Sequence, residues 1–324
     1  MSTRKEAPPK KPRMADGWYV ADGKFPAEPL ERMAYYARLA PSAFNAQPWK
    51  FVLGASEIDV FADLARWHAA ADAEQRALHL SIGCAIEALR IAADFGGWGT
   101  EVAYFPVHGD DTLIARLRVA FAGPKRDDAA ADLLRHMITR HTSRRDYTND
   151  AVADSDRKRL YQCFEIGDVS LHFLNDRVAL DALAGLETRA EAALLGRPGY
   201  RAQALQQAGS MGMSWLLSRI AGQAGAGLAS APLVALLSTR NDRRLDQVQA
   251  GQAFLRVALV AEAHDIRVQP VGPLIELPEA RAELGRIFGF EARTPQHIFR
   301  LGHAAAESGS HPRRPLDEIL VRAS

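Results

Sequence analysis

A chain of 324 residues with 40 basic and 39 acidic side chains is close to electrical neutrality, which argues against a dedicated nucleic-acid-binding surface. Its two cysteines, Cys84 and Cys163, are too few and too far apart in sequence for a disulfide framework or a zinc site, and they fit a reducing compartment. No apolar stretch approaches the length of a membrane span. We therefore expect a cytoplasmic globular protein that binds neither nucleic acid nor membrane.

The chain begins with a basic, proline-rich segment that lacks the apolar core of a secretory signal. We expect residues 1–27 to form a flexible tail. Apolar residues at helical spacing then predict a helix over 30–40, which Pro41 ends. The stretch KFVL predicts a strand over 50–53, and a further helix is expected from about residue 57.

A polar corner joins the first helix to the first strand, where the sequence reads APSAFNAQPW. A turn explains Ser42 and Pro48, because serine and proline are common in turns, and it can also accommodate Asn45. A turn does not explain Gln47 and Trp49, which are not turn formers. At this point the corner is either a structural turn or a binding site.

A helix that is apolar nearly all round is predicted over 80–95, and a strand follows over 100–106. The same order of elements returns later in the chain, with a buried strand before the second apolar helix. The second set comprises helix 155–164, strand 169–174, a helix from about 177, strand 231–237, helix 248–263 and a strand near 266–277.

The two apolar helices can be aligned so that Gly83 meets Gly251 and Leu80 meets Val248. Chance similarity between alanine-rich helices is one explanation. The shared order of the neighbouring elements favours the other explanation, which is an internal duplication. The chain then divides into a first unit over 28–139 and a second unit over 140–324.

An arginine-rich motif, RHTSRRDY, opens the second unit after the amphipathic stretch DDAAADLLRHMI. Arg140, Arg144 and Arg145 suit an anion, because a guanidinium group binds phosphate through two parallel hydrogen bonds. The alternative is that these arginines interact with the dipole of the preceding helix at its C-terminus. Arg313 and Arg314, close to the end of the chain, have the alternative of a solvated tail.

Several common chemistries lack their motifs. No GxGxxG follows a strand, and no GxxxxGK[ST] occurs, so neither a Rossmann site nor a P-loop is supported. His136 and His141 have no HExxH context, and Ser214 has no GxSxG context. Cys84 lies in the middle of an apolar helix, where an inert core thiol is expected.

Four motifs, taken in order, resemble those of the flavin-binding nitroreductases. They are APSAFNAQPW, RHTSRRDY, VQPVGP at 268–273 and the closing RLGHA…HPRRPLDEIL. The corner precedes the arginine motif, an order that resembles the Acg family, in which two nitroreductase units are fused. The resemblance covers about residues 28–322. It implies an α+β fold of two fused units that imitate a dimer, each with an antiparallel-rich sheet flanked by helices.

The resemblance also implies one FMN per chain, bound by residues of both units. The first unit would hydrogen-bond the polar edge of the ring and the ribityl chain through Ser42, Asn45 and Gln47. The second unit would hold the phosphate through Arg140, Thr142, and Arg313 or Arg314. It would contact the ring through Arg144 near the N1–O2 edge. The backbone of Pro270, Val271 and Gly272 would lie near N5 and O4. Arg145 would be a further cofactor-binding residue.

Two functions are compatible with this resemblance. In the first, the flavin carries the chemistry, and an FMN-dependent oxidoreductase passes electrons from NADH or NADPH to a nitroaromatic or quinone-like small molecule. In the second, the protein binds or stores flavin under a lid with little turnover. The lid would be residues 196–230, with Met211, Met213 and Trp215 over the ring; a helix pair packed on the surface is the alternative for this stretch. We expect a monomer, with further self-association left open.

Overall fold

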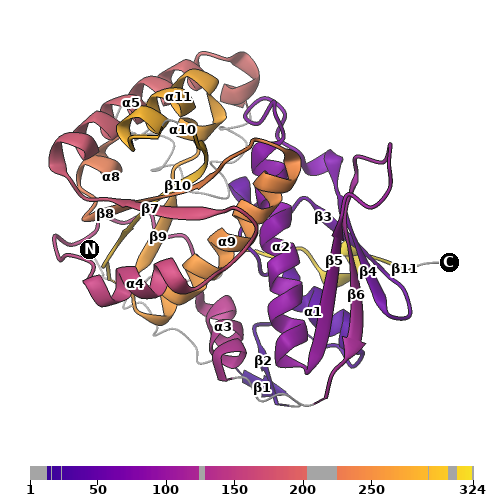
Figure 1. The fold of residues 1–324 in the computed structure, drawn as a ribbon. Helices are drawn as coiled ribbons and strands as arrows, with labels where there is room; N and C mark the ends of the chain where they lie inside the picture. Colours follow the sequence, from indigo (N-terminus) through magenta and orange to yellow (C-terminus); the bar gives the residue numbers. More distant parts are fainter. Residues whose placement is uncertain are drawn as a thin grey trace, which may run out of the picture.

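The computed structural model describes residues 13–15, 17–22, 24–123, 128–202, 225–290, 292–305 and 312–322. Two sheets flank a central helical layer, as Figure 1 shows. The helices α2 (Arg76–Phe95) and α9 (Arg244–Ala263) lie side by side in this layer. Among the described residues, no helix combines the length and the apolar composition needed to cross a bilayer.

The first sheet contains five strands in the order β11-β3-β4-β6-β5. Neighbouring strands are antiparallel except β11, which pairs in parallel with β3. The helices α1 (Pro29–Ala37) and α2 pack against this sheet. Its strands are Trp49–Leu53 (β3), Glu57–Ala62 (β4), Trp98–Tyr104 (β5), Leu113–Phe121 (β6) and Leu320–Arg322 (β11).

The second sheet contains four antiparallel strands in the order β7-β8-β10-β9. Every residue of its β8 strand is buried, as expected for the apolar run at 231–237. The α+β class with antiparallel-rich sheets is therefore confirmed. The strands are Ser170–Leu174 (β7), Leu233–Thr239 (β8), Arg267–Pro270 (β9) and Thr294–Gly302 (β10).

The remaining helices surround the two sheets. In Figure 1, α5 and α11 cover the outer face of the second sheet, and α9 covers its inner face. These helices are α3 (Asp128–Thr139), α4 (Asp154–Gln162), α5 (Arg177–Leu195), α8 (Ala226–Ala229), α10 (Pro273–Glu276), α11 (Pro278–Ile287) and α12 (Leu316–Ile319), with 3-10 turns at Ala43–Asn45 and Leu64–Arg66.

The crossing of α2 and α9 depends on two glycines. A Cβ atom on Gly83 would lie 2.0 Å from the carbonyl oxygen of Val248, and one on Gly251 would lie 2.0 Å from that of Leu80. Only glycine allows two helix backbones to approach this closely. The contacts are reciprocal, because the sequence alignment pairs Gly83 with Gly251 and Leu80 with Val248. The crossing thus has the geometry of a two-fold axis.

Two expected elements differ in the structure. The helix expected from residue 57 is the strand β4, in which Ile58, Val60 and Ala62 are buried and alternate with less buried residues. This period of two is the pattern of a strand with one buried face. The strand expected near 266–277 ends at Pro270, and Pro273 begins α10 because its fixed φ suits the first turn of a helix.

Part of the segment expected as a flexible tail, 1–27, is folded. The strands β1 (Arg13–Ala15) and β2 (Trp18–Val20) pair as an antiparallel hairpin. Trp18 is buried, with its ring centroid 4.7 Å from that of Phe95 at the end of α2. The apolar surface of this tryptophan anchors the hairpin, and the sequence expectation of a tail is wrong for these residues.

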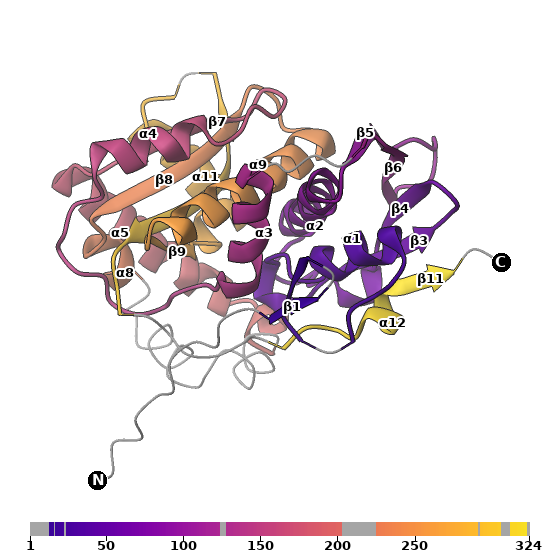
Figure 2. The same ribbon diagram turned by 90° about the horizontal axis from the view of Figure 1, so that it is seen from below.

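The end of the chain returns to the first unit. After β10, residues of the second unit lead to α12 and β11, which add to the first sheet beside β3. Figure 2 shows these two yellow elements against the indigo and purple half of the molecule. A boundary at residue 139 therefore divides the sequence, but the first sheet combines four strands from before this boundary with one strand, β11, from after it.

Candidate functional site

One pocket is lined by residues of both expected units and encloses about 1060 Å³ of atom-free space, its open mouth included. The first unit contributes residues of the polar corner and of α2, and the second contributes residues of the arginine motif, β9, β10 and α10. The sequence-predicted residues among them are Ser42, Thr142, Arg144, Pro270 and Gly272.

The polar corner is strained. Phe44, Asn45 and Gln47 have φ angles of 54°, 55° and 51°, in the left-handed region that residues with a side chain adopt rarely. The hydroxyl of Ser42 accepts a hydrogen bond from the Gln47 amide at 3.0 Å, and the Ser81 hydroxyl of α2 accepts one from the Ala43 amide at 3.0 Å. Clustered strain of this kind is characteristic of binding sites.

Asn45 and Gln47 do not line the pocket. Their side chains hold the C-terminal segment instead: Asn45 Nδ2 donates to the Pro312 carbonyl at 2.9 Å, and Gln47 Oε1 accepts from the Arg314 amide at 2.8 Å. The Arg313 guanidinium also donates to Asn45 Oδ1. The corner and the closing basic motif, which are more than 260 residues apart in sequence, therefore form one structural unit.

Arg314 is an anchor for this segment. Its guanidinium pairs with the buried Asp63 at 3.1 Å and donates to the carbonyl oxygens of Gln47 and Trp49 at 3.1 and 3.3 Å. Of the two arginines expected near the phosphate, Arg314 thus donates to the first unit through Nη1 and to the Glu318 carbonyl through Nη2.

Arg140, Arg313 and Arg38 form an arginine cluster behind the corner, in which Arg38 and Arg140 are buried and Arg313 is partly buried. Burial, followed by the positive charges of Arg140 and Arg38, lowers the pKa of Arg313 to about 9. Arg140 is only 9% exposed, and its Nε atom, like that of Arg38, has no hydrogen-bond partner among the described residues. Asp22 pairs with Arg38. Buried positive charge with so little compensation is costly unless an anion binds there.

The arginine motif lies along the outer edge of β9. Thr142 forms a parallel bridge with Val268, and the Ser143 amide donates to the Val268 carbonyl at 3.2 Å. This pairing brings Thr142 and Arg144 to the pocket. Arg145 is exposed and does not line the pocket, and its carbonyl accepts a hydrogen bond from Arg300 at 2.7 Å.

The backbone atoms of residues 270–272 differ in whether they are free to bind a ligand in the pocket. The Val271 amide donates to the Ile298 carbonyl of β10 at 2.9 Å, and the Val271 side chain packs in the core on the α5 side of the sheet. Pro270 has no amide hydrogen. The Val271 amide is therefore engaged within the sheet, while Pro270 and Gly272 line the pocket.

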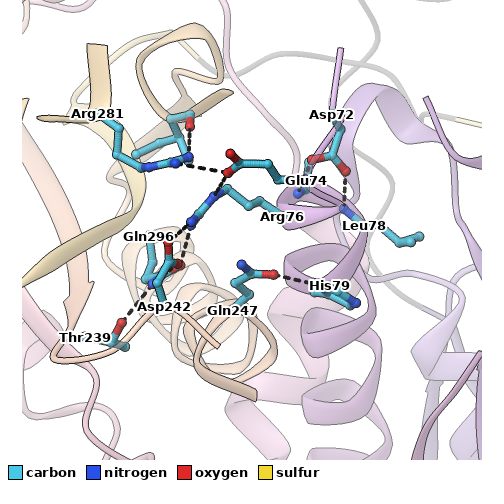
Figure 3. Close-up of polar contacts among 12 residues, drawn as sticks. Asp72, Glu74, Arg76, Leu78, His79, Thr239, Asp242, Gln247, Arg281 and Gln296 are labelled. Atoms are coloured by element: carbon cyan, nitrogen blue, oxygen red, sulfur yellow. Dashed lines mark hydrogen bonds and ion pairs between the residues drawn. The ribbon is translucent and has the colours of Figure 1, made fainter. Parts of the chain in front are cut away.

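The opposite wall of the pocket carries groups that the sequence analysis missed. Figure 3 shows Arg76 at the start of α2, where it pairs with Glu74 at 2.8 Å and with Asp242, and donates to Gln296 Oε1 at 3.3 Å. His297, next to Gln296 on β10, also lines the pocket. No motif marks these residues, because the turns of the fold bring them together from distant segments.

The symmetry of the α2–α9 crossing defines a counterpart position, at which Gln252 replaces the pocket residue Cys84. The Tyr104 hydroxyl donates to Gln252 Oε1 at 2.8 Å, and Gln252 Nε2 donates to Glu87 at 2.9 Å. The fully buried Glu87 carboxylate also pairs with Arg256 and Arg90. Side chains therefore occupy the counterpart position with paired charges, although the Nε atom of Arg90 has no hydrogen-bond partner among the described residues.

The thiol of Cys84 is buried, which raises its pKa, and it donates to the Gly251 carbonyl at 3.1 Å. An inert core thiol was expected, and this environment agrees with it. Within the described part of the chain, no group of histidine, cysteine and carboxylate side chains could hold a metal ion.

Comparisons with known proteins give a consistent picture. The chain matches no profile of a known protein family. It is 26% identical, over 93% of its length and 95% of theirs, to proteins from two Mycobacterium tuberculosis strains that are named as proposed NAD(P)H nitroreductases. The crystal structure of a proposed nitroreductase from Anabaena variabilis matches 85% of this chain and 87% of its own with a TM-score of 0.60 and 12% identity. The chain therefore shares its fold with the proposed nitroreductase from Anabaena variabilis and is similar in sequence to the mycobacterial proteins along nearly its whole length.

Proposed function

We propose that the protein is an FMN-dependent oxidoreductase that reduces a nitroaromatic or quinone-like small molecule with electrons from NADH or NADPH. The observation that carries this proposal is the arginine cluster of Arg38, Arg140 and Arg313 behind a pocket shared by both units. A bound phosphate monoester would supply further negative charge to a cluster in which Asp22 pairs with Arg38. The names of the mycobacterial relatives agree with the proposed activity.

The phosphate would be held by Arg140 and Arg313, with Thr142 as a hydroxyl ligand. Arg313 already donates to the Leu39 carbonyl at 3.0 Å, which orients its guanidinium beside the corner. Arg314 would act indirectly, because its contacts with Asp63 and the corner fix the position of Arg313. Asn45 and Gln47 would act in the same indirect way.

The ring would lie in the pocket, where the flavin supplies the electron-transfer chemistry. Arg144 would place a positive charge near the N1–O2 edge and favour the accumulation of negative charge there on reduction. Ser42 and the backbone at Pro270 and Gly272 would bind the other polar atoms of the ring. Arg145, being exposed, would contribute through the electrostatic field of the site.

The filled counterpart position supports a fused, Acg-type pair of units with one FMN per chain. The units would be residues 28–139 and 140–324, arranged as a monomer that imitates a dimer. A phosphate near Glu87 would meet a buried carboxylate whose arginine partners are already paired. The two free cysteines support a cytoplasmic location.

A second candidate function, flavin storage under a lid, is favoured by Tyr200. This residue belongs to the expected lid at 196–230, is 3% exposed and lines the pocket. Met211, Met213 and Trp215 lie outside the described residues.

Stopped-flow mixing tests the two functions. The purified protein, loaded with FMN and separated from excess, is mixed anaerobically with NADPH or NADH while absorbance near 450 nm, where oxidised flavin typically absorbs, is recorded. Bleaching within seconds, followed by recovery on adding menadione, is the expected result. Bound flavin that neither nucleotide bleaches would support storage, and failure to bind FMN would contradict both functions.

A further inference from the structure

The strand β10 contains a bulge where it borders the pocket. Its register against β8 shifts between Pro295, which pairs with Ser238, and His297, which pairs with Leu237. In a regular strand, Gln296 and His297 would point to opposite faces of the sheet. Both line the pocket instead. Bulges next to binding sites commonly redirect a side chain in this way, and here the bulge brings a second polar group to the same wall.

The neighbouring residues Gln296 and His297 differ in how fully their side chains are hydrogen-bonded within the protein. The Gln296 amide is saturated within the protein, since Nε2 donates to Thr239 Oγ1 at 2.8 Å and to Asp242 at 3.2 Å, and Oε1 accepts from Arg76 (Figure 3). His297 Nε2 is buried and has no hydrogen-bond partner among the described residues. A buried polar group without a partner destabilises the protein, so its retention points to a ligand that completes it.

The surroundings of His297 fix its protonation. Its ring centroid lies 4.4 Å from that of Phe254 of α9 and 5.8 Å from that of Phe299. Burial among these rings lowers the pKa of His297 to about 3, so the imidazole is neutral at physiological pH. A neutral imidazole offers one N–H donor and one acceptor.

The position of His297 separates it from the arginine motif among the proposed cofactor ligands. Thr142 pairs with β9 on one edge, and β10 pairs with β9 on the other, so β9 lies between His297 and the arginine motif. The polar atoms of a flavin ring are concentrated toward its pyrimidine end, and the benzenoid end carries only methyl groups. With Arg144 at the pyrimidine end, the hydrogen-bond partner of His297 has to come from a second ligand.

We propose that His297 is a specificity residue whose imidazole hydrogen-bonds a carbonyl or nitro oxygen of an aromatic electron acceptor in the pocket. The inference rests on the proposed function. The remaining wall suits such a ligand, because Phe44, Tyr200 and Phe254 offer aromatic surface, and Arg76 and Gln296 are held by protein partners. The pocket thus favours an aromatic ring with an oxygen atom directed toward β10.

The test compares two aromatic ligands, of which menadione has carbonyl oxygens and 2-methylnaphthalene has none. Menadione and 2-methylnaphthalene are titrated into the oxidised, FMN-loaded protein, and dissociation constants are read from changes in the flavin spectrum. The His297→Phe variant should weaken menadione binding about tenfold and leave 2-methylnaphthalene binding within about twofold of the wild type. His297→Gln, which retains a donor and an acceptor, should recover most of the menadione affinity.

A matched control is His172→Phe. His172 is also a histidine packed against an aromatic ring, Phe290, at 4.5 Å, but it bonds Ser238 and lies outside the pocket. This variant should bind both ligands as the wild type does. Equal menadione affinity in His297→Phe would overturn the inference while leaving the proposed function intact. Weakened FMN retention in His297→Phe would overturn it as well, by showing a cofactor contact, and a wild type that binds no FMN would overturn both proposals.

Discussion

The pocket beside Cys84 and its counterpart beside Gln252 occupy equivalent places on either side of the α2–α9 crossing. They differ in how many partners their buried charged groups have. Beside the pocket, Arg140 is buried with an unpartnered Nε atom. At the counterpart, Glu87 is buried with Gln252, Arg256 and Arg90 bonded to it. Side chains occupy the position beside Gln252, and we propose that the position beside Cys84 is the one that binds an anion. The predictions below alter one side of this comparison at a time.

The largest effect is expected at the counterpart. Glu87→Gln would leave Arg256 and Arg90 without their carboxylate, and breaking a buried ion pair costs about 3–5 kcal/mol. Both arginines are partly exposed and can rehydrate, so about 3 kcal/mol of unfolding free energy should be lost. Urea unfolding measures this loss. The exposed Glu101→Gln on β5 is the control, and a variant as stable as the wild type would show that the charges do not hold the counterpart closed.

Removing the charge beside the pocket should not lower the unfolding free energy of the apoprotein and can raise it. Arg140→Met replaces a buried, poorly compensated guanidinium with an apolar side chain, so the apoprotein should be as stable as the wild type or more stable. FMN affinity should fall by about 1.5–3 kcal/mol, the usual contribution of a hydrogen bond to a charged group. Isothermal titration with FMN and melting of the apoprotein give both values. Arg159→Met on the exposed face of α4 should change neither, and a destabilised Arg140→Met apoprotein with normal affinity would make Arg140 a structural residue.

Raising the pH should weaken cofactor binding through Arg313. The pKa of Arg313 is lowered to about 9, first by burial and then by Arg140 and Arg38, so the unfolded chain binds more protons than the apoprotein above that pH. The destabilisation caused by this charge is full below pH 9 and is relieved progressively as pH rises from 9 toward the ordinary arginine pKa of 12.5, so apoprotein stability should rise over this window. FMN affinity should fall by up to about tenfold per pH unit above 9, because the phosphate needs the charged form. Titrations between pH 7 and 10 check this trend, and Arg313→Met should remove it.

The smallest effect is expected from Asn45→Ala combined with Gln47→Ala. These side chains bond the 312–314 segment rather than line the pocket, so the double variant should loosen the segment that carries Arg313. FMN affinity should fall about fivefold to tenfold, as expected when one or two net hydrogen bonds are lost. The phosphate-free analogue riboflavin should bind as it does to the wild type. Equal losses for FMN and riboflavin would instead indicate direct contacts of Asn45 and Gln47 with the ring.

Sequence patterns could identify the corner and the arginine motif because their residue types already carry the chemistry. They could also place the apolar central helices, whose glycines mark the close crossing at Gly83 and Gly251. The helix expected from residue 57 is wrong, because the six residues of β4 alternate between buried and less buried positions.

Other features depend on tertiary contacts that no local pattern reports. Arg38 and Arg76 resemble ordinary helix-terminal arginines in the sequence, and only the fold places the first beside Arg313 and the second beside Gln296. His297 reaches the pocket through a bulge that follows Pro295, and although a proline is compatible with a bulge, the local sequence does not report which side chains the shifted register turns toward the pocket. The left-handed residues of the corner were also not predicted, because they are phenylalanine, asparagine and glutamine rather than glycine.

The ratio of FMN to protein tests the central claim most directly. The protein is saturated with FMN, freed of excess by gel filtration and denatured by heat, and the released flavin is measured by absorbance against protein from amino-acid analysis. One open site and one closed counterpart predict a ratio close to one FMN per chain. A ratio approaching two would show that the counterpart beside Glu87 also binds the cofactor, and a ratio near zero would show that the arginine cluster does not hold FMN.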